Sequence, residues 1–245
     1  TIDFRTRREF GGLIIDWFKN FHAKSFDISL SEDGKFWDKV YSVSSNSSDV
    51  SFIKLSEVEA RLLRINLMES NSEESFGISE IKFLDIKNSL TPNDFLRFTA
   101  MNSPKGNYPR YFLDEASFWT VLGVNNDVKE AMINKDGMVE VDKSAFSIEP
   151  MLKVGNAFFN WSNVSATQSL ENEYLPVPKV NWNCNDLNLE VEAFANGEAN
   201  KNSTLFIKYT LTNNSSSVKD GKLFLMIRPF QVNPHYQWLN DPGGV

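Results

Sequence analysis

Alternation of apolar and polar residues along the chain predicts short β-strands. From Phe26 to Ser31 the two kinds alternate strictly, which places Phe26, Ile28 and Leu30 on one face of a strand. The same period-two pattern returns at 63–67, 187–193, 205–212 and 223–227. Asp-Gly or Asn-Gly pairs, typical of tight turns, occur at 33–34, 136–137, 196–197 and 220–221. We therefore predict an all-β chain.

Helical periodicity is weak by comparison. The segment Ser56-Glu57-Val58-Glu59 has the spacing of a helix capping box, but it runs directly into the alternating pattern at 63–67. We expect one helical turn there, and we find no sustained helical stripe elsewhere in the chain.

A Pro- and Gly-rich stretch at 88–110 divides the chain, because residues of these types interrupt strand pairing. We predict a β-sandwich domain at 1–87, a linker or first strand at 88–110, and a second β-domain at 111–245. A domain of fewer than 90 residues is small for a complete sandwich. We therefore expect a fragment of a longer protein, whose opening strands lie upstream and whose second domain continues beyond Val245.

Composition excludes several classes of function. The 245 residues carry 25 Lys and Arg against 32 Asp and Glu, a formal charge of −7 with no basic cluster, which argues against nucleic-acid binding. No apolar run approaches the ~20 residues of a membrane-spanning helix. Cys184 is the only cysteine, and the chain has only two histidines, His22 and His235. We expect no disulfide, no metal site and no cofactor.

Candidate catalytic groups are weak. Acidic residues are plentiful, but Glu190 and Glu192 fall on the polar face of a predicted strand, and nothing sets any pair at the separation that glycosidases use. There is no Gly-x-Ser-x-Gly motif, and Cys184 is best explained as a buried, inert thiol. We assign no catalytic residue, and we expect that this part of the protein is not itself an enzyme.

Four landmarks in order over residues 8–86 resemble a known family. They are an apolar strand ending at Asp16-Trp17, a hairpin from Ser31 to Trp37 with the sequence Ser-Glu-Asp-Gly-Lys-Phe-Trp, the strand Ala60–Ile65, and Gly77-Ile78-Ser79-Glu80-Ile81. Together they are similar to the discoidin, or coagulation factor 5/8 type C, domain. The resemblance implies a galactose-binding-like jelly roll, here partial, in a family many of whose members bind sugars.

The residues within these landmarks support local expectations. Gly34 supplies the positive φ of a tight hairpin, and Trp37 folds back over the end of the barrel as a core plug. Arg64, on an otherwise apolar strand, is expected to pair with Asp16 or Glu80. The segment 17–22, Trp-Phe-Lys-Asn-Phe-His, is either an aromatic and polar sugar platform or a strand end with buried aromatic side chains.

The second half is similar to the N-terminal β-supersandwich of large bacterial carbohydrate-active proteins. The resemblance rests on the segments 114–123, 136–141, 146–150, 168–170, 174–178 and 228–234. In those proteins a discoidin-like module precedes the supersandwich and a helical glycosidase-like barrel follows it. The resemblance implies a non-catalytic, N-terminal part of a secreted glycoside hydrolase, periplasmic or extracellular. The implied partners are a glycan and the downstream helical catalytic domain.

The stretch 228–238 holds the densest set of groups that can hydrogen-bond to hydroxyls. A predicted strand ends at Arg228-Pro229, and amide, imidazole and aromatic side chains follow within a few residues. The candidate carbohydrate-binding residues are Arg228, Gln231, Asn233, His235, Gln237 and Trp238. The alternative is an ordered structural loop whose amides satisfy buried backbone groups.

Two other functions remain open from the sequence. One is a stand-alone carbohydrate-binding or adhesion module with no catalytic domain downstream. The other is a catalytic β-sandwich, such as a lyase or an epimerase.

Overall fold

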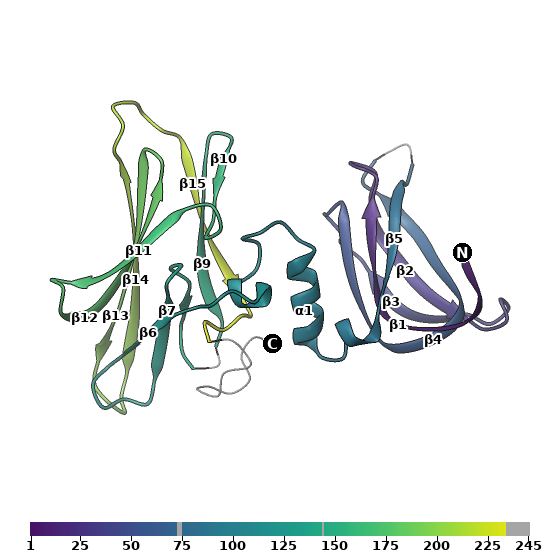
Figure 1. Cartoon of the computed structure of the whole chain (residues 1–245), viewed down its shortest axis with the longest axis horizontal. Coiled ribbons are helices and arrows are strands. Elements are labelled where there is room, and N and C mark those ends of the chain that lie inside the picture. Colours follow the sequence, from purple (N-terminus) through teal and green to yellow (C-terminus); the bar gives the residue numbers. More distant parts are fainter. Residues whose placement is uncertain (73–74, 144, 234–245) are drawn as a thin grey trace. The chain divides into compact units, whose positions relative to one another are not determined.

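The computed structural model describes residues 1–72, 75–143 and 145–233 (Figure 1). The chain forms two compact units, Thr1–Thr99 and Ala100–Val245. Both are built from antiparallel sheets, which confirms the predicted all-β class. In the part of the chain that the structure describes, no helix is long and apolar enough to cross a bilayer.

The first unit is one five-stranded antiparallel sheet in the order β3-β2-β4-β1-β5. Its strands are β1 (Ile2–Trp17), β2 (Ala23–Ser31), β3 (Asp38–Val43), β4 (Val50–Ser70) and β5 (Ile78–Leu84). The long strand β4 pairs with β1 on one side and with β2 on the other. The register of β1 against β4 shifts between Phe10 and Gly12. A Cβ at Gly12 would lie 2.1 Å from the carbonyl oxygen of Ile53, so the close approach of these strands requires glycine.

One face of this sheet forms the core of the first unit. The alternation in β2 places Phe26, Ile28 and Leu30 in that core, at 0%, 0% and 8% exposure, as the sequence pattern predicts. Leu13 and Ile15 of β1 join them from the neighbouring part of the sheet. Burying this apolar surface is what holds the long strands together.

The structure overturns both helix expectations. Ser56–Glu59 lie inside β4, where Val58 and Glu59 pair with Phe10 and Glu9 of β1, so no helical turn forms there. A ten-residue helix, α1 (Pro92–Met101), instead occupies the stretch expected to be a linker or strand. Short 3₁₀ helices, η1 (Ile86–Asn88) and η2 (Arg110–Leu113), lie on either side of it.

The second unit is built from two antiparallel sheets. One contains β6 (Trp119–Gly123), β7 (Glu130–Asn134), β8 (Val139–Glu140), β9 (Ser147–Val154), β10 (Ala157–Phe159) and β15 (Gly221–Arg228). The other contains β11 (Ser165–Glu171), β12 (Leu175–Cys184), β13 (Leu187–Gly197) and β14 (Ser203–Asn213). Residues of both sheets, among them Ile133, Leu152 and the fully buried Trp182, form one apolar core.

Candidate functional site

The β2–β3 hairpin carries the most specific motif of the first unit, and its geometry is structural. Gly34 has a φ of 75°, and the Asp33 carboxylate accepts the backbone N–H groups of Phe36 and Lys35 at 3.0 and 2.8 Å. These two hydrogen bonds lower the pKa of Asp33. Trp37 donates from Nε1 to the carbonyl oxygen of Gly34 at 3.0 Å. Gly34 therefore has the positive φ that the sequence predicts, but β2 and β3 are joined by the longer segment 32–37 and not by a tight two-residue turn.

Two expectations around this hairpin were wrong. Trp37 is only half-buried, so it does not plug the end of the core. The Arg64 guanidinium lies over its ring, 3.7 Å from the ring centre. Asp16 and Glu80 instead form ion pairs with Lys82, at 3.1 and 3.0 Å. A planar guanidinium is satisfied by an aromatic face in a partly exposed place, so Arg64 needs no carboxylate there.

The segment 17–22 divides between core and surface: its first residue is buried, as the strand-end interpretation expects, and the sugar platform stays a prediction for the rest. Trp17 is 4% exposed and donates from Nε1 to Ser51 Oγ at 2.9 Å, which makes it part of the core. Phe18 is 59% exposed, and its ring lies 5.7 Å from that of Phe21. The polar end of the segment, His22, reaches a hollow in the protein surface.

His22 and Lys24 line a hollow of about 460 Å³ together with residues that are distant in sequence. The other lining residues are Ser44, Ser45, Asn46, Ser47 and Glu69. His22 Nδ1 lies 2.9 Å from Asp49 Oδ1, a contact that lowers the pKa of Asp49 and orients the imidazole ring. Lys24 Nζ lies 3.4 Å from Glu69 Oε1. Imidazole, ammonium, carboxylate and hydroxyl groups thus converge where a polyhydroxylated ligand could bind.

Sequence reasoning found His22 but missed its neighbours in this hollow. Lys24 and Glu69 belong to the paired strands β2 and β4, and Asn46 belongs to the loop between β3 and β4. Only strand pairing brings them together. The one available signal was the abundance of Ser and Asn at 44–48, which is also typical of an ordinary loop.

The described part of the predicted 228–238 site lies mainly in the protein interior. Arg228 Nε is 3.1 Å from Glu149 Oε2, and Arg228 also donates to the carbonyl oxygen of Asn107. Gln231 and Asn233 are 5% and 1% exposed. His235, Gln237 and Trp238 lie outside the described residues. A sugar-contacting role for the six candidates therefore stays a prediction.

The carboxyl group of Glu149 is strongly perturbed. Its pKa is raised to about 7, with burial as the largest cause; Arg228 lowers the pKa and the nearby Asp136 raises it. An ion pair buried to this degree contributes little net stability, because both charges lose water.

We expect Glu149 to make the second unit less stable as pH rises from about 4.5 to 7. The folded state binds the proton more tightly than the unfolded state, so the stabilising contribution is complete below pH 4.5 and is lost as pH rises through 7. The loss is roughly 3 kcal/mol. Urea unfolding across this range should show it as a difference between the wild type and Glu149→Gln, and parallel pH profiles would contradict it.

Two other groups weighed from the sequence lie in ordinary structural surroundings. Glu192 forms an ion pair with Lys179 at 3.1 Å. Cys184 is buried, and burial raises the pKa of its thiol to about 11, as expected for an inert cysteine. Within 1–72, 75–143 and 145–233, no three His, Cys, Asp or Glu side chains are grouped as a metal site would require.

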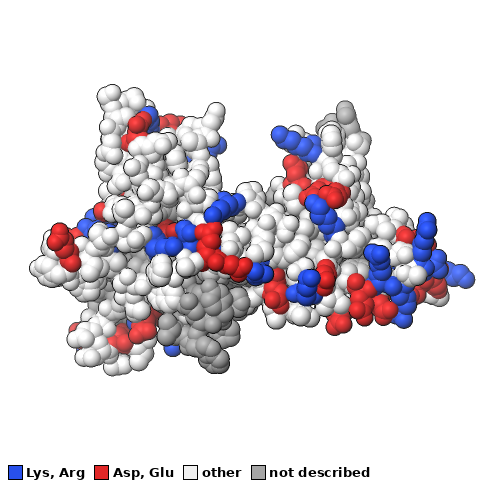
Figure 2. Space-filling model, in the orientation of Figure 1, with Lys and Arg blue, Asp and Glu red and all other residues white. Residues whose placement is uncertain are grey.

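Surface charge on the first unit is mixed in sign. Figure 2 shows Lys and Arg side chains interleaved with Asp and Glu on the face it draws. Arg7 pairs with Glu32 and Glu59, and Arg61 pairs with Asp3. Such pairing leaves no broad basic patch on that face.

Comparison with known proteins finds a similarity for the first unit only. Searches of curated proteins and of solved structures find no match to the chain. The family model of the F5/8 type C domain matches residues 1–81. The first unit is therefore similar to the F5/8 type C, or discoidin, domain, as its four sequence landmarks predicted.

Proposed function

We propose that this chain is a non-catalytic, carbohydrate-binding part of a larger carbohydrate-active protein. The similarity of residues 1–81 to the F5/8 type C domain supports this proposal, because many members of that family bind sugars. The observation that carries it is the hollow at His22, where an imidazole held by Asp49 lies beside Lys24 and Glu69. The exposed Phe18 is in the same loop and offers a flat apolar face.

The larger protein in this proposal is a secreted glycoside hydrolase, periplasmic or extracellular, with a helical catalytic domain downstream. The resemblance of the second half to β-supersandwich domains supports it. On this proposal the second unit supports the catalytic domain, and the 228–238 segment helps to shape its sugar site. A stand-alone adhesion module would instead lack that domain, and a catalytic β-sandwich would turn over a glycan by itself.

Glycan binding by the isolated chain should be weak and should depend on His22. The hollow is polar and open, so few apolar contacts add to its hydrogen bonds. We therefore expect a Kd in the millimolar range, which corresponds to a standard binding free energy of about −4 kcal/mol. Glycan-array screening followed by calorimetry would identify the ligand. His22→Ala and Lys24→Ala should each weaken its binding roughly tenfold, because each removes a hydrogen-bonding group.

Lys19→Ala is the matched control, since Lys19 is an exposed lysine of the same loop that does not line the hollow. Melting temperatures would show that each variant is folded. If the His22, Lys24 and Lys19 variants bind the glycan with equal affinity, the proposed site is wrong. Release of sugar by the purified chain, lost on replacing a single carboxylate, would favour the catalytic alternative.

A further inference from the structure

A second hollow, of about 570 Å³, lies in the second unit where its two sheets meet at their edges. The edge strands are β6 of one sheet and β11 of the other, and β7 and β12 run beside them. Gln168 of β11 donates from Nε2 to the carbonyl oxygen of Lys135 at 2.8 Å, which ties the two sheets together here. The volume is within the range of small-molecule sites, roughly 300–1,000 Å³.

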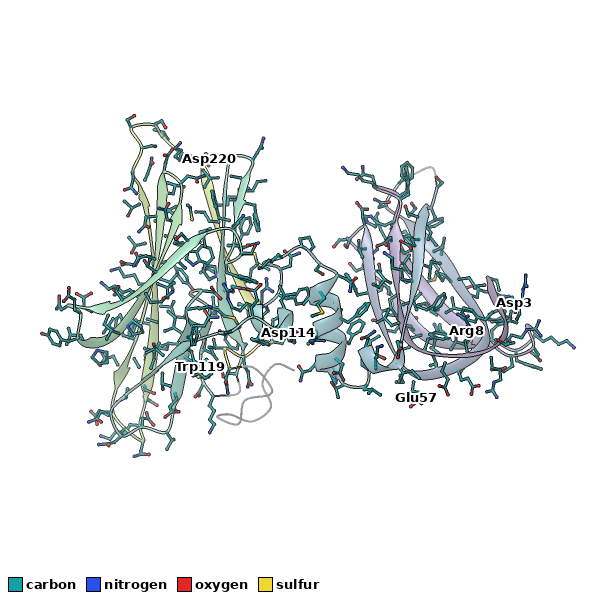
Figure 3. All side chains as sticks on the ribbon, viewed as in Figure 1. Asp3, Arg8, Glu57, Asp114, Trp119 and Asp220 are labelled. Carbon is teal, nitrogen blue, oxygen red and sulfur yellow. The ribbon has the colours of Figure 1, made fainter. Side chains whose placement is uncertain are left out.

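The walls of this hollow combine a buried apolar floor with one exposed aromatic ring. Ile133 and Val180 contribute side chains that are each 2% exposed, so the floor is fixed by the core. Phe118 is 67% exposed and precedes Trp119, the first residue of β6 (Figure 3). An aromatic ring this exposed contributes little to folding, and it presents a flat face on which a sugar ring can stack.

The charge of the hollow is positive. Its lining residues include Lys135 and Lys179 and no Asp or Glu. Lys179 is neutralised by ion pairs with Glu171 and Glu192. Lys135 is half-buried, its Nζ lies 5.1 Å from the ring centre of Phe118, and it has no carboxylate partner among the described residues. A cation held over an aromatic ring without a counter-ion will attract an anion.

A neutral donor lies beside this cation. Asn134 is 6% exposed and pairs with Trp119 across the β6–β7 ladder. Its Oδ1 accepts the backbone N–H groups of Asp136 and Met138, each at 2.9 Å. The amide nitrogen of Asn134 therefore remains as the donor that can serve a ligand in this hollow.

We propose that this hollow binds a uronate residue of an acidic glycan. The sugar ring stacks on Phe118, its carboxylate pairs with Lys135, and its hydroxyls bond to Asn134 and Gln168. The site is separate from the hollow at His22 on which the proposed function rests, and it gives the second unit a specificity for acidic sugars.

The test uses the whole chain and two trisaccharides with the same sugar rings, one charged and one with its carboxylates neutralised by methyl groups. These are trigalacturonate and its neutral methyl ester, titrated by calorimetry or by ligand-observed NMR. The variants are Lys135→Gln and Phe118→Ala. The matched controls are Lys153→Gln and Phe158→Ala, an exposed lysine of β9 and an exposed phenylalanine of β10 that do not line the hollow. Thermal melts establish that every variant is folded.

We expect the acid to bind roughly tenfold more tightly than the ester, and Lys135→Gln to remove that preference. Phe118→Ala should weaken both ligands, and the two controls should leave both affinities unchanged. Equal binding of acid and ester would overturn the proposal. So would an effect of Lys135→Gln no larger than that of Lys153→Gln, or no detectable binding of trigalacturonate. If His22→Ala abolishes acid binding while Lys135→Gln does not, the uronate site is wrong and the proposed function stands.

Discussion

Replacing Arg110 with alanine is expected to lower the free energy of unfolding of the second unit by about 3–5 kcal/mol. Nε and Nη2 of Arg110 each donate to one carboxylate oxygen of Asp136 at 2.8 Å, and Asp136 is only 4% exposed. Nη1 also donates to Glu115 at 2.6 Å. The alanine variant would leave a buried carboxylate without its partner. Urea denaturation followed by tryptophan fluorescence would measure the loss.

Two further variants define the contribution of Arg110. Arg110→Lys keeps the charge but cannot make the paired hydrogen bonds. Its free energy of unfolding should therefore lie between those of the wild type and Arg110→Ala. Lys219→Ala breaks an ion pair with the largely exposed Asp186 and should cost less than about 1 kcal/mol. If Arg110→Ala lowers the free energy of unfolding no more than Lys219→Ala does, the buried ion pair does not stabilise the second unit.

Trp182→Ala should have an effect of similar size, about 3–5 kcal/mol, for a different reason. Trp182 is fully buried in the core of the second unit, and truncation would leave a large cavity between the two sheets. Its Nε1 also donates to the carbonyl oxygen of Asp136 at 2.9 Å. The midpoint of urea unfolding, followed by circular dichroism, would report the change.

Tyr174→Ala is the control for Trp182→Ala, because Tyr174 is 74% exposed and its loss should change stability by less than about 0.5 kcal/mol. Trp182→Phe would fill part of the space, so it should cost less than Trp182→Ala while still losing the hydrogen bond to Asp136 and some packing. A Trp182→Ala protein that unfolds at the wild-type urea concentration would mean that the two sheets do not depend on this core.

The faces of the strands could be predicted because alternation is a local property. In β13 the alternating residues Leu187, Leu189, Val191 and Ala193 are all buried, and the polar residues between them are only partly buried. The same rule placed Phe26 and Ile28 correctly in β2. A residue two positions along a strand returns to the same face whatever the rest of the chain does.

The missed helix had a signal that was not read. Thr91 Oγ1 accepts the backbone N–H of Asp94 at 3.1 Å, and the Asp94 carboxylate accepts the N–H of Thr91 at 2.9 Å. This reciprocal cap, followed by Pro92 in the first turn, is a helix start signature. The Pro-rich surroundings of α1 favour a linker, and the local cap outweighs them. The similar spacing at Ser56–Glu59 formed no helix, because Val58 and Glu59 pair with Phe10 and Glu9 of β1.

The candidate site of the first unit depended on contacts that no local pattern contains. The resemblance to the F5/8 type C domain pointed to sugar binding, and it could not name Lys24, Asn46 and Glu69 as neighbours of His22. Arg64 was assigned to a carboxylate, and in the folded protein it stacks on Trp37. Which partner a cation takes depends on distances that sequence spacing does not determine.

Local patterns in the sequence were enough to determine the all-β class, the inward faces of β2 and β13, the positive φ at Gly34 and the similarity of the first unit to the F5/8 type C domain. Each depends on residues within a few positions of one another, or on motifs in a fixed order. Tertiary structure alone decided that Gln231 and Asn233 are buried, that Glu149 pairs with Arg228, and that Phe118 and Lys135 share a hollow with Gln168. The physical reason is that burial, charge pairing and concavity arise from strand pairing and sheet packing, which join residues far apart in the chain.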